Sequence, residues 1–324
     1  MVGVADGESG AGCEVTNRDD PAMTSLPNGH SSKRQRETAS RTQKTLRRRR
    51  ATNAFMVGVL ALSAVLATIP LILILYHLLK SGLSSVNVDF FTNIPKPPGE
   101  TGGGMYNAIV GTLMLVAMAS VIGMPVGIGA GLYLVERKGT KLANMVRFLA
   151  DVLNGLPSIV MGIFAWQFLV KPLGHFSALA GAAALAAMMV PMVTRTTEEM
   201  VSLVPTSLRE AALALGYSRA RTAMTVVLRT ATAGIVTGAL IAVARIAGET
   251  APLLFTALGN QFTSYSLNKP IAALPLQIFN YAVSPYDDWH SQAWAGALVL
   301  IALVLIISLA ARAATRGRID LGAD

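Results

Sequence analysis

Six stretches of 20 to 29 residues carry almost no charge, and no other feature constrains the fold of this chain as strongly; they cover residues 54–79, 107–135, 142–170, 172–194, 230–257 and 292–311. A helix needs about 20 mostly apolar residues to cross a hydrocarbon core of about 30 Å. Backbone groups in lipid must hydrogen-bond within their own segment, so stretches of this length form helices, whereas barrel strands need only about ten residues. The sequence therefore predicts an all-α polytopic membrane protein with six transmembrane helices.

The distribution of basic residues predicts the orientation of these helices. If the amino terminus is cytoplasmic, 21 of the 27 Lys and Arg residues lie in the tails and loops on the cytoplasmic side. Four lie outside, and two lie within the predicted spans; the four are Lys80, Lys96, Lys171 and Lys269. Cytoplasmic loops of membrane proteins carry such an excess of Lys and Arg. We therefore expect both termini to be cytoplasmic and the protein to be a multi-pass component of the cytoplasmic (inner) membrane.

The first 50 residues differ in composition from the rest of the chain. Nine basic residues lie between Lys33 and Arg50, after a segment rich in Gly, Asp, Ser and Asn. A basic run beside a span favours contact with anionic lipid headgroups over contact with nucleic acid. We expect residues 1–50 to form a disordered basic cytoplasmic tail, residues 51–315 to form the membrane domain, and residues 316–324 to form a short cytoplasmic tail.

The segment over residues 197–229 is too amphipathic to be a simple linker. Pro205 interrupts a preceding helix, and Ser207 with Glu210 has the spacing of a capping box that starts a new one. Gly216 is suited to end that helix in the left-handed conformation. A second helix is expected from Ser218. The pattern predicts a helical hairpin that projects into the cytoplasm and offers an Ala-rich face to a partner.

Residues within this hairpin resemble a known family. Glu210, Ala211 and Ala212, followed after three residues by Gly216, are similar to the EAA loop in permease subunits of binding-protein-dependent ABC importers. The Ile-x-Leu-Pro that usually follows is absent, because the sequence reads Val226-Val227-Leu228-Arg229. The resemblance implies the permease fold of type I ABC importers (MetI-like). It also implies that Glu210, Ala211, Ala212 and Gly216 form the coupling helix that docks into an ATPase subunit.

Further segments narrow the resemblance to the A-type permease subunit of phosphate ABC importers. They are Gly155–Val160, Val190–Glu198, Gly248–Leu254, Ala272–Ile278 and Ser284–Asp288. The similarity covers about residues 100–315 and does not include the amino-terminal tail. It implies a homologous C-type permease, two copies of an ATPase subunit and an extracytoplasmic phosphate-binding protein as partners, with membrane lipid around the spans and no nucleic acid.

Four charged residues lie inside predicted spans, where inserting an Arg or Asp costs about 2.5–3.5 kcal/mol at the helix centre. Arg147 with Asp151 and Arg245 with Glu249 are each spaced one helical turn apart, so each pair could neutralise itself. Arg147 lies close enough to a span end to snorkel, and for this pair structural and functional roles stay equally open. Arg245 lies deeper, about 15 residues into its span, which favours a functional role.

An arginine within a span is suited to carry an oxyanion, because its guanidinium binds phosphate with two parallel hydrogen bonds and does not deprotonate. A neighbouring carboxylate such as Glu249 keeps the binding weak enough for release. Arg195, at the inner mouth of its span, is the second candidate. In the resembled family, arginines at the positions of Arg195 and Arg245 are associated with the phosphate path, with Glu249 as partner.

The chain is not expected to be an enzyme. It contains no Gly-Lys dipeptide and therefore no Walker phosphate-binding loop, so a partner must hydrolyse ATP. No cofactor and no metal are predicted. A permease for another oxyanion, such as sulfate or molybdate, a secondary transporter and a membrane scaffold for signalling stay open as alternatives.

Three glycines at intervals of four residues, Gly123, Gly127 and Gly131, lie on one face of the second predicted span. Small residues in this pattern allow two helix backbones to approach closely. We therefore expect this stripe to pack against another helix.

Overall fold

The computed structural model describes residues 29–100 and 102–319, with side chains over residues 49–100 and 102–313. It separates into two compact units, residues 1–71 and residues 72–324. Helices dominate both, as predicted, and the described residues include five helices long and apolar enough to cross a membrane, or six if one bent pair counts as a single span.

The first unit consists, in its described part, of most of the long helix α1 (Gly29–Leu83). Of the tail expected over residues 1–50, residues 1–28 lie outside the described region, and residues 29–50 belong to α1. Residues 31–50 contain neither Gly nor Pro. Because helix nucleation is the costly step, an existing span can extend through such residues at little further cost.

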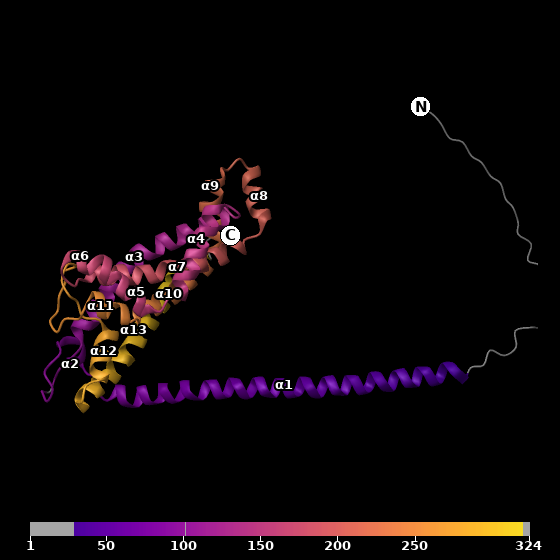
Figure 1. Ribbon diagram of the computed structural model, residues 1–324, viewed down its shortest axis with the longest axis horizontal. Helices are drawn as coiled ribbons and strands as arrows, with labels where there is room; N and C mark the ends of the chain where they lie inside the picture. Colours follow the sequence, from indigo (N-terminus) through magenta and orange to yellow (C-terminus); the bar gives the residue numbers. More distant parts are fainter. Residues whose placement is uncertain (1–28, 101, 320–324) are drawn as a thin grey trace, which may run out of the picture. The chain divides into compact units, whose positions relative to one another are not determined.

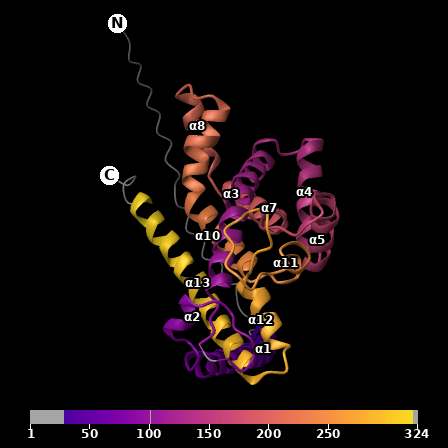
Figure 2. The same ribbon diagram turned by 90° about the vertical axis from the view of Figure 1, so that its left-hand side faces the viewer.

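The second unit is a helical bundle (Figures 1 and 2). Its elements are α2 (Val88–Thr92), α3 (Tyr106–Glu136), α4 (Lys141–Gly155), α5 (Ser158–Ala165), η1 (Trp166–Val170), α6 (Lys171–Leu173), α7 (Ala178–Ser202), α8 (Thr206–Ala214), α9 (Arg219–Arg221), η2 (Thr222–Val227), α10 (Leu228–Ala247), α11 (Ala251–Thr256), α12 (Leu274–Ala282) and α13 (Asp287–Ile319). Both figures place α8 at one end of the bundle and α2 with α12 at the other.

Three predicted spans differ from the observed helices. The span over residues 142–170 is broken: α4 and α5 meet at an angle of 107°, because Pro157 interrupts the helix between them. The span predicted over residues 172–194 is instead Ala178–Ser202, since Gly174 ends α6 with a positive φ of 75° and Ser177 caps the next helix. The helix predicted over residues 230–257 ends at Ala247, and α11 follows as a separate short helix.

The core of the bundle is the contact between α3 and α7, and the predicted glycine stripe lies in it. A Cβ atom on Gly123 would lie 3.1 Å from the Met189 sulfur, and one on Gly127 would lie 2.7 Å from Val193 Cβ. At Gly131 the carbonyl oxygen of Thr194 would be 2.6 Å away. The predicted close packing is confirmed, and no larger residue fits along this face without moving α7.

Replacing Gly127 by valine is expected to destabilise the bundle by about 1–3 kcal/mol, because the new side chain would overlap Val193 across the α3–α7 contact. Gly129 on the same helix is a matched control, since a Cβ atom there has nothing within 4 Å. The midpoint of thermal unfolding in detergent measures the effect. Equal midpoints for the two variants would contradict the packing described here.

The segment between α11 and α12 folds back on the end of α3. The Asn107 side chain donates hydrogen bonds to the carbonyl oxygens of Asn260 and Gln261, at 2.6 and 3.2 Å. The hydroxyls of Tyr106 and Tyr265 lie 3.1 Å apart, and this hydrogen bond raises the pKa of Tyr265 above its ordinary value. These contacts fix the loop that follows α11, and with it the end of the bundle opposite to α8.

Candidate solute path and coupling site

Arg245 and Glu249 lie together at the end of α10, as their spacing predicts. Arg245 Nε is 3.6 Å from Glu249 Oε1, and the two side chains are 55% and 16% exposed. The helix ends at Ala247, and Gly248 and Glu249 hydrogen-bond back to the carbonyl oxygens of Arg245 and Ile246. At 3.6 Å this ion pair is longer than a hydrogen bond, and the Arg245 guanidinium stays half exposed on the side away from the bundle core.

Arg245 continues an uncovered face of α10. The exposed residues at intervals of one turn before it are Ala233, Thr237 and Ile241, of which two are small. Two glycines of α10 pack on α7: a Cβ atom on Gly238 would lie 1.9 Å from Thr196 Cγ2, and one on Gly234 would lie 2.3 Å from the Met200 sulfur. Small side chains on an open helix face leave room either for a passage or for another helix at close approach.

Arg195 lies in a different cluster, between α7 and α4. Its Nε donates to Asp151 Oδ1 at 2.6 Å, and its Nη2 donates to Asp151 Oδ2. Its Nη1 donates to Glu198 Oε2 at 2.6 Å. Glu198 also accepts from Arg147, whose Nε and Nη2 lie 2.8 and 2.5 Å from Oε1. Two arginines and two carboxylates thus alternate in a continuous chain, which we call the α4–α7 charge chain.

The partners of Arg147 and Asp151 differ from those that their spacing along α4 allows. They do not neutralise one another along α4; each pairs with a side chain of α7 instead. The structure brings Arg245 and Glu249 together but does not bring Arg195 to them. Because α10 runs antiparallel to α7 and Gly238 lies beside Thr196, Arg245 is seven residues, or about 10 Å, further along the bundle than the charge chain.

The predicted hairpin at the other end is present and is formed by α8 and α9 (Figure 1). The amide of Gly216 donates to Leu213, the amide of Tyr217 donates to Ala212, and Gly216 has a φ of 83°. This is a Schellman ending, which requires a left-handed residue and so favours glycine. The capping box predicted for Ser207 and Glu210 is wrong: α8 begins after Pro205 without a side-chain cap, because the proline fixes the start of the helix.

The hairpin exposes apolar side chains that a bundle in water would bury. Of the predicted coupling residues, Ala212 is buried, while Glu210, Ala211 and Gly216 are exposed. Large apolar residues are exposed around them, namely Leu203, Leu208, Leu213, Leu215, Tyr217 and Met224. Except for Met224, these residues lie outside the candidate membrane spans, and an exposed apolar patch there indicates a surface for another protein.

An ion pair that the sequence analysis missed ties the hairpin to the bundle. Arg209 Nη1 on α8 lies 2.6 Å from Glu136 Oε1 at the end of α3, and Nη2 donates to the carbonyl oxygen of Val201 at 3.3 Å. The only sequence signal was a charged residue at each of two helix ends, which does not identify a pair. These two contacts join α8 to the ends of α3 and α7.

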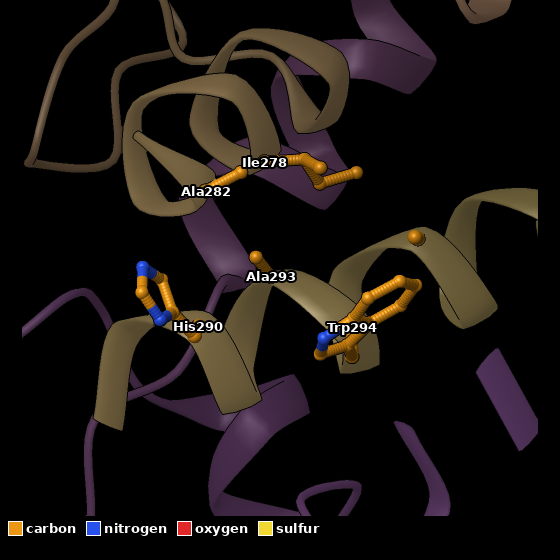
Figure 3. Close-up of a pocket in the computed structure, with 6 residues that line it drawn as sticks. Ile278, Ala282, His290, Ala293 and Trp294 are labelled. Carbon is orange, nitrogen blue, oxygen red and sulfur yellow. The ribbon is translucent and has the colours of Figure 1, made fainter. Parts of the chain in front are cut away.

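A separate cavity of about 440 Å³ lies between α12 and α13 (Figure 3). Its lining is mostly apolar and consists of Ile278, Ala282, His290, Ala293, Trp294 and Ala297. The ring of His290 donates from Nε2 to the carbonyl oxygen of Ser284 at 2.7 Å. The lining contains no Arg or Lys, so this cavity does not suit an oxyanion. Across the described side chains, no group of three or more His, Cys, Asp and Glu residues could hold a metal ion.

Comparison with known proteins gives three findings. A family model described as "Binding-protein-dependent transport system inner membrane component" matches residues 123–319. The phosphate transport system permease protein PstA of Haemophilus influenzae is 44% identical over 82% of this chain and 94% of that protein. Its counterpart in Xylella fastidiosa (strain Temecula1) is 46% identical over 84% and 95%.

Among solved structures, a chain of the MetNI methionine ABC transporter in inward-facing conformations superposes with a TM-score of 0.55 and 21% identity. The superposition covers 66% of this chain and 96% of that chain. At this level of identity the likeness concerns the fold, and it agrees with the MetI-like fold implied by the sequence.

Proposed function

Because the chain belongs to the family of binding-protein-dependent transport system inner membrane components, we propose that it is a membrane-spanning permease subunit of an ATP-driven importer of inorganic phosphate. It is a multi-pass protein of the inner membrane. Phosphate is favoured as the solute because both relatives described above, at 44% and 46% identity, are phosphate transport permeases.

The observation that carries this proposal is the half-exposed Arg245–Glu249 pair on the uncovered face of α10. One guanidinium offers the two parallel hydrogen bonds that a phosphate oxygen pair accepts. Glu249 partly offsets the positive charge, so the anion binds weakly enough to leave again. We assign the solute path to Arg245 and Glu249, with Arg195 as a second arginine about 10 Å further along the bundle.

Phosphate entry into a negative-inside cell requires work. Moving one charge against 100 mV costs about 2.3 kcal/mol, and a divalent anion costs about twice that before any concentration gradient. The permease itself is proposed to have no enzymatic activity. The hairpin around Glu210, Ala211, Ala212 and Gly216 would receive the movement of an ATPase subunit and pass it through Arg209 to Glu136 on α3.

The partners of an ABC permease include an ATPase and a binding protein. For this chain we propose a homologous C-type permease, two ATPase subunits and an extracytoplasmic phosphate-binding protein. The second permease would cover the open face of α10, and transport would proceed by alternating access. The apolar side chains of α1 between residues 55 and 76 are exposed throughout, which suits contact with lipid or with that second permease.

Solute uptake by the reconstituted complex tests the function. Proteoliposomes that contain both permeases and the ATPase, supplied with the binding protein and internal ATP, are expected to accumulate [³²P]phosphate and not [³⁵S]sulfate or [⁹⁹Mo]molybdate. Uptake that persists without ATP would indicate a secondary transporter. Uptake of sulfate or molybdate in place of phosphate would assign the chain to another oxyanion, and no uptake of any of the three would favour the scaffold alternative.

A further inference from the structure

Arg195 is paired with two carboxylates in this structure. Three of its nitrogens donate to Asp151 and Glu198, at 2.6 Å for Nε to Asp151 Oδ1 and for Nη1 to Glu198 Oε2. The fork formed by Nε and Nη2 is occupied by the two oxygens of Asp151. While Asp151 is in place, this fork cannot bind a second anion.

The Asp151 carboxylate binds Arg195 in the same way that a phosphate would. A carboxylate and a phosphate both present two oxygens to the same guanidinium fork, with two parallel charge-assisted hydrogen bonds. An anion that binds this fork of Arg195 must therefore displace Asp151. We propose that Asp151 is a built-in competitor that sets how tightly Arg195 holds the transported oxyanion; this rests on the proposed function, in which Arg195 lies on the solute path.

The solvent exposure of the two carboxylates indicates that Asp151, and not Glu198, is the one that can leave Arg195. The Asp151 side chain is 50% exposed, whereas that of Glu198 is 14% exposed and is also held by Arg147. Asp151 can swing away from Arg195 into open space, while Glu198 is fixed by contacts on both sides. The remaining Glu198–Arg195 bond keeps the guanidinium in place when Asp151 leaves.

The charge balance explains why a competitor is useful. The α4–α7 charge chain has two positive and two negative members, so its net charge is zero while Asp151 is in place. Without the Asp151 carboxylate the cluster would carry one positive charge and an open fork beside the path. Conduction requires that each site be weak enough to release its ion. By competing for the guanidinium, Asp151 keeps Arg195 from binding the transported anion too tightly to release it.

The experiment compares four versions of the purified complete importer, without binding protein: wild type, Asp151→Asn, Asp151→Asn with Arg195→Gln, and Arg147→Gln. Retention of [³²P]phosphate by each complex is measured in this state, and the maximal uptake rate is measured separately in proteoliposomes supplied with the binding protein and internal ATP. Asp151→Asn is expected to raise retention about tenfold, since it removes the negative charge and one of the two oxygens that accept from Arg195, and to lower the maximal uptake rate. The added Arg195→Gln substitution is expected to abolish the gain in retention.

Arg147→Gln is the matched control. It weakens the same α4–α7 contact through Glu198 but leaves the Asp151–Arg195 fork in place, so retention is expected to stay at the wild-type level. Asp151→Ala provides a second removal of the carboxylate at this half-exposed position if the asparagine variant does not assemble.

Two results would overturn the proposal: unchanged or lower retention in both Asp151 variants, or an equal gain in Arg147→Gln. The wild-type uptake assay separates this failure from failure of the proposed function. Wild-type proteoliposomes that accumulate phosphate while the Asp151 variants retain no more than wild type reject only the competitor. Wild-type proteoliposomes that take up no phosphate reject the function itself.

Discussion

Replacing Arg245 by glutamine is expected to lower phosphate uptake about 100-fold or more. The guanidinium is 55% exposed on the open face of α10, and a bidentate contact with phosphate contributes two charge-assisted hydrogen bonds of about 1.5–3 kcal/mol each. Glutamine keeps much of the side-chain length but loses the positive charge and the planar fork. Initial rates of [³²P]phosphate uptake in proteoliposomes measure the change.

Arg229→Gln is the control for this prediction, because Arg229 is exposed near the other end of the same helix. It is expected to keep uptake within about twofold of wild type, a change of less than 1 kcal/mol. Both variants should assemble with the ATPase in equal amounts. Normal uptake by Arg245→Gln, with normal assembly, would remove Arg245 from the solute path.

Replacing Gly216 by aspartate is expected to uncouple ATP hydrolysis from uptake. Gly216 has a φ of 83°, and a non-glycine residue in this conformation costs about 1–2 kcal/mol. The new residue would distort the end of α8 and place a charge at the apolar tip of the hairpin. A displacement of functional groups by about 1 Å can lower a rate about 100-fold. Uptake should therefore fall by about that factor, while ATP hydrolysis by the complex continues.

Gly139→Asp is a matched control for the hairpin. Gly139 has a φ of 89°, nothing lies within 4 Å of its Cβ position, and it connects α3 to α4 outside the hairpin. The backbone strain of the two variants is thus similar, and only the Gly216 variant should lose uptake. The ratio of ATP hydrolysed to phosphate transported is the measurement. An equal loss in both variants would show that strain, and not docking of the hairpin, is responsible.

Most of the fold could be predicted from the sequence because the spans are encoded locally. The length and apolarity of the helix over residues 106–136 identify it without any knowledge of its neighbours. The breaks near Pro157 and Gly248 were harder, because an apolar run continues across each of them. Hydropathy indicates whether a segment can lie in a membrane, but it does not indicate where the backbone changes direction.

The candidate site was predictable in part for the same reason. Arg245 and Glu249 are four residues apart at the end of α10, so their spacing was enough to pair them. The partners of Arg195 and Arg147 come from another helix, and the order of contacts between α4 and α7 depends on tertiary packing. The hairpin was found because Gly216 marks a local backbone conformation, whereas its link through Arg209 to Glu136 bridges 73 residues.

The charge chain also has a consequence for biogenesis. Arg147, Asp151, Arg195 and Glu198 would each be costly to release singly into lipid, at about 2.5–3.5 kcal/mol for an Arg or Asp at a helix centre. Only the short elements α5, η1 and α6 separate α4 from α7 in the chain, so the partners leave the ribosome soon after one another. We expect the translocon to release α4 to α7 into the bilayer as one hairpin with its charges already paired, and the first half to stall there until the second has been synthesised.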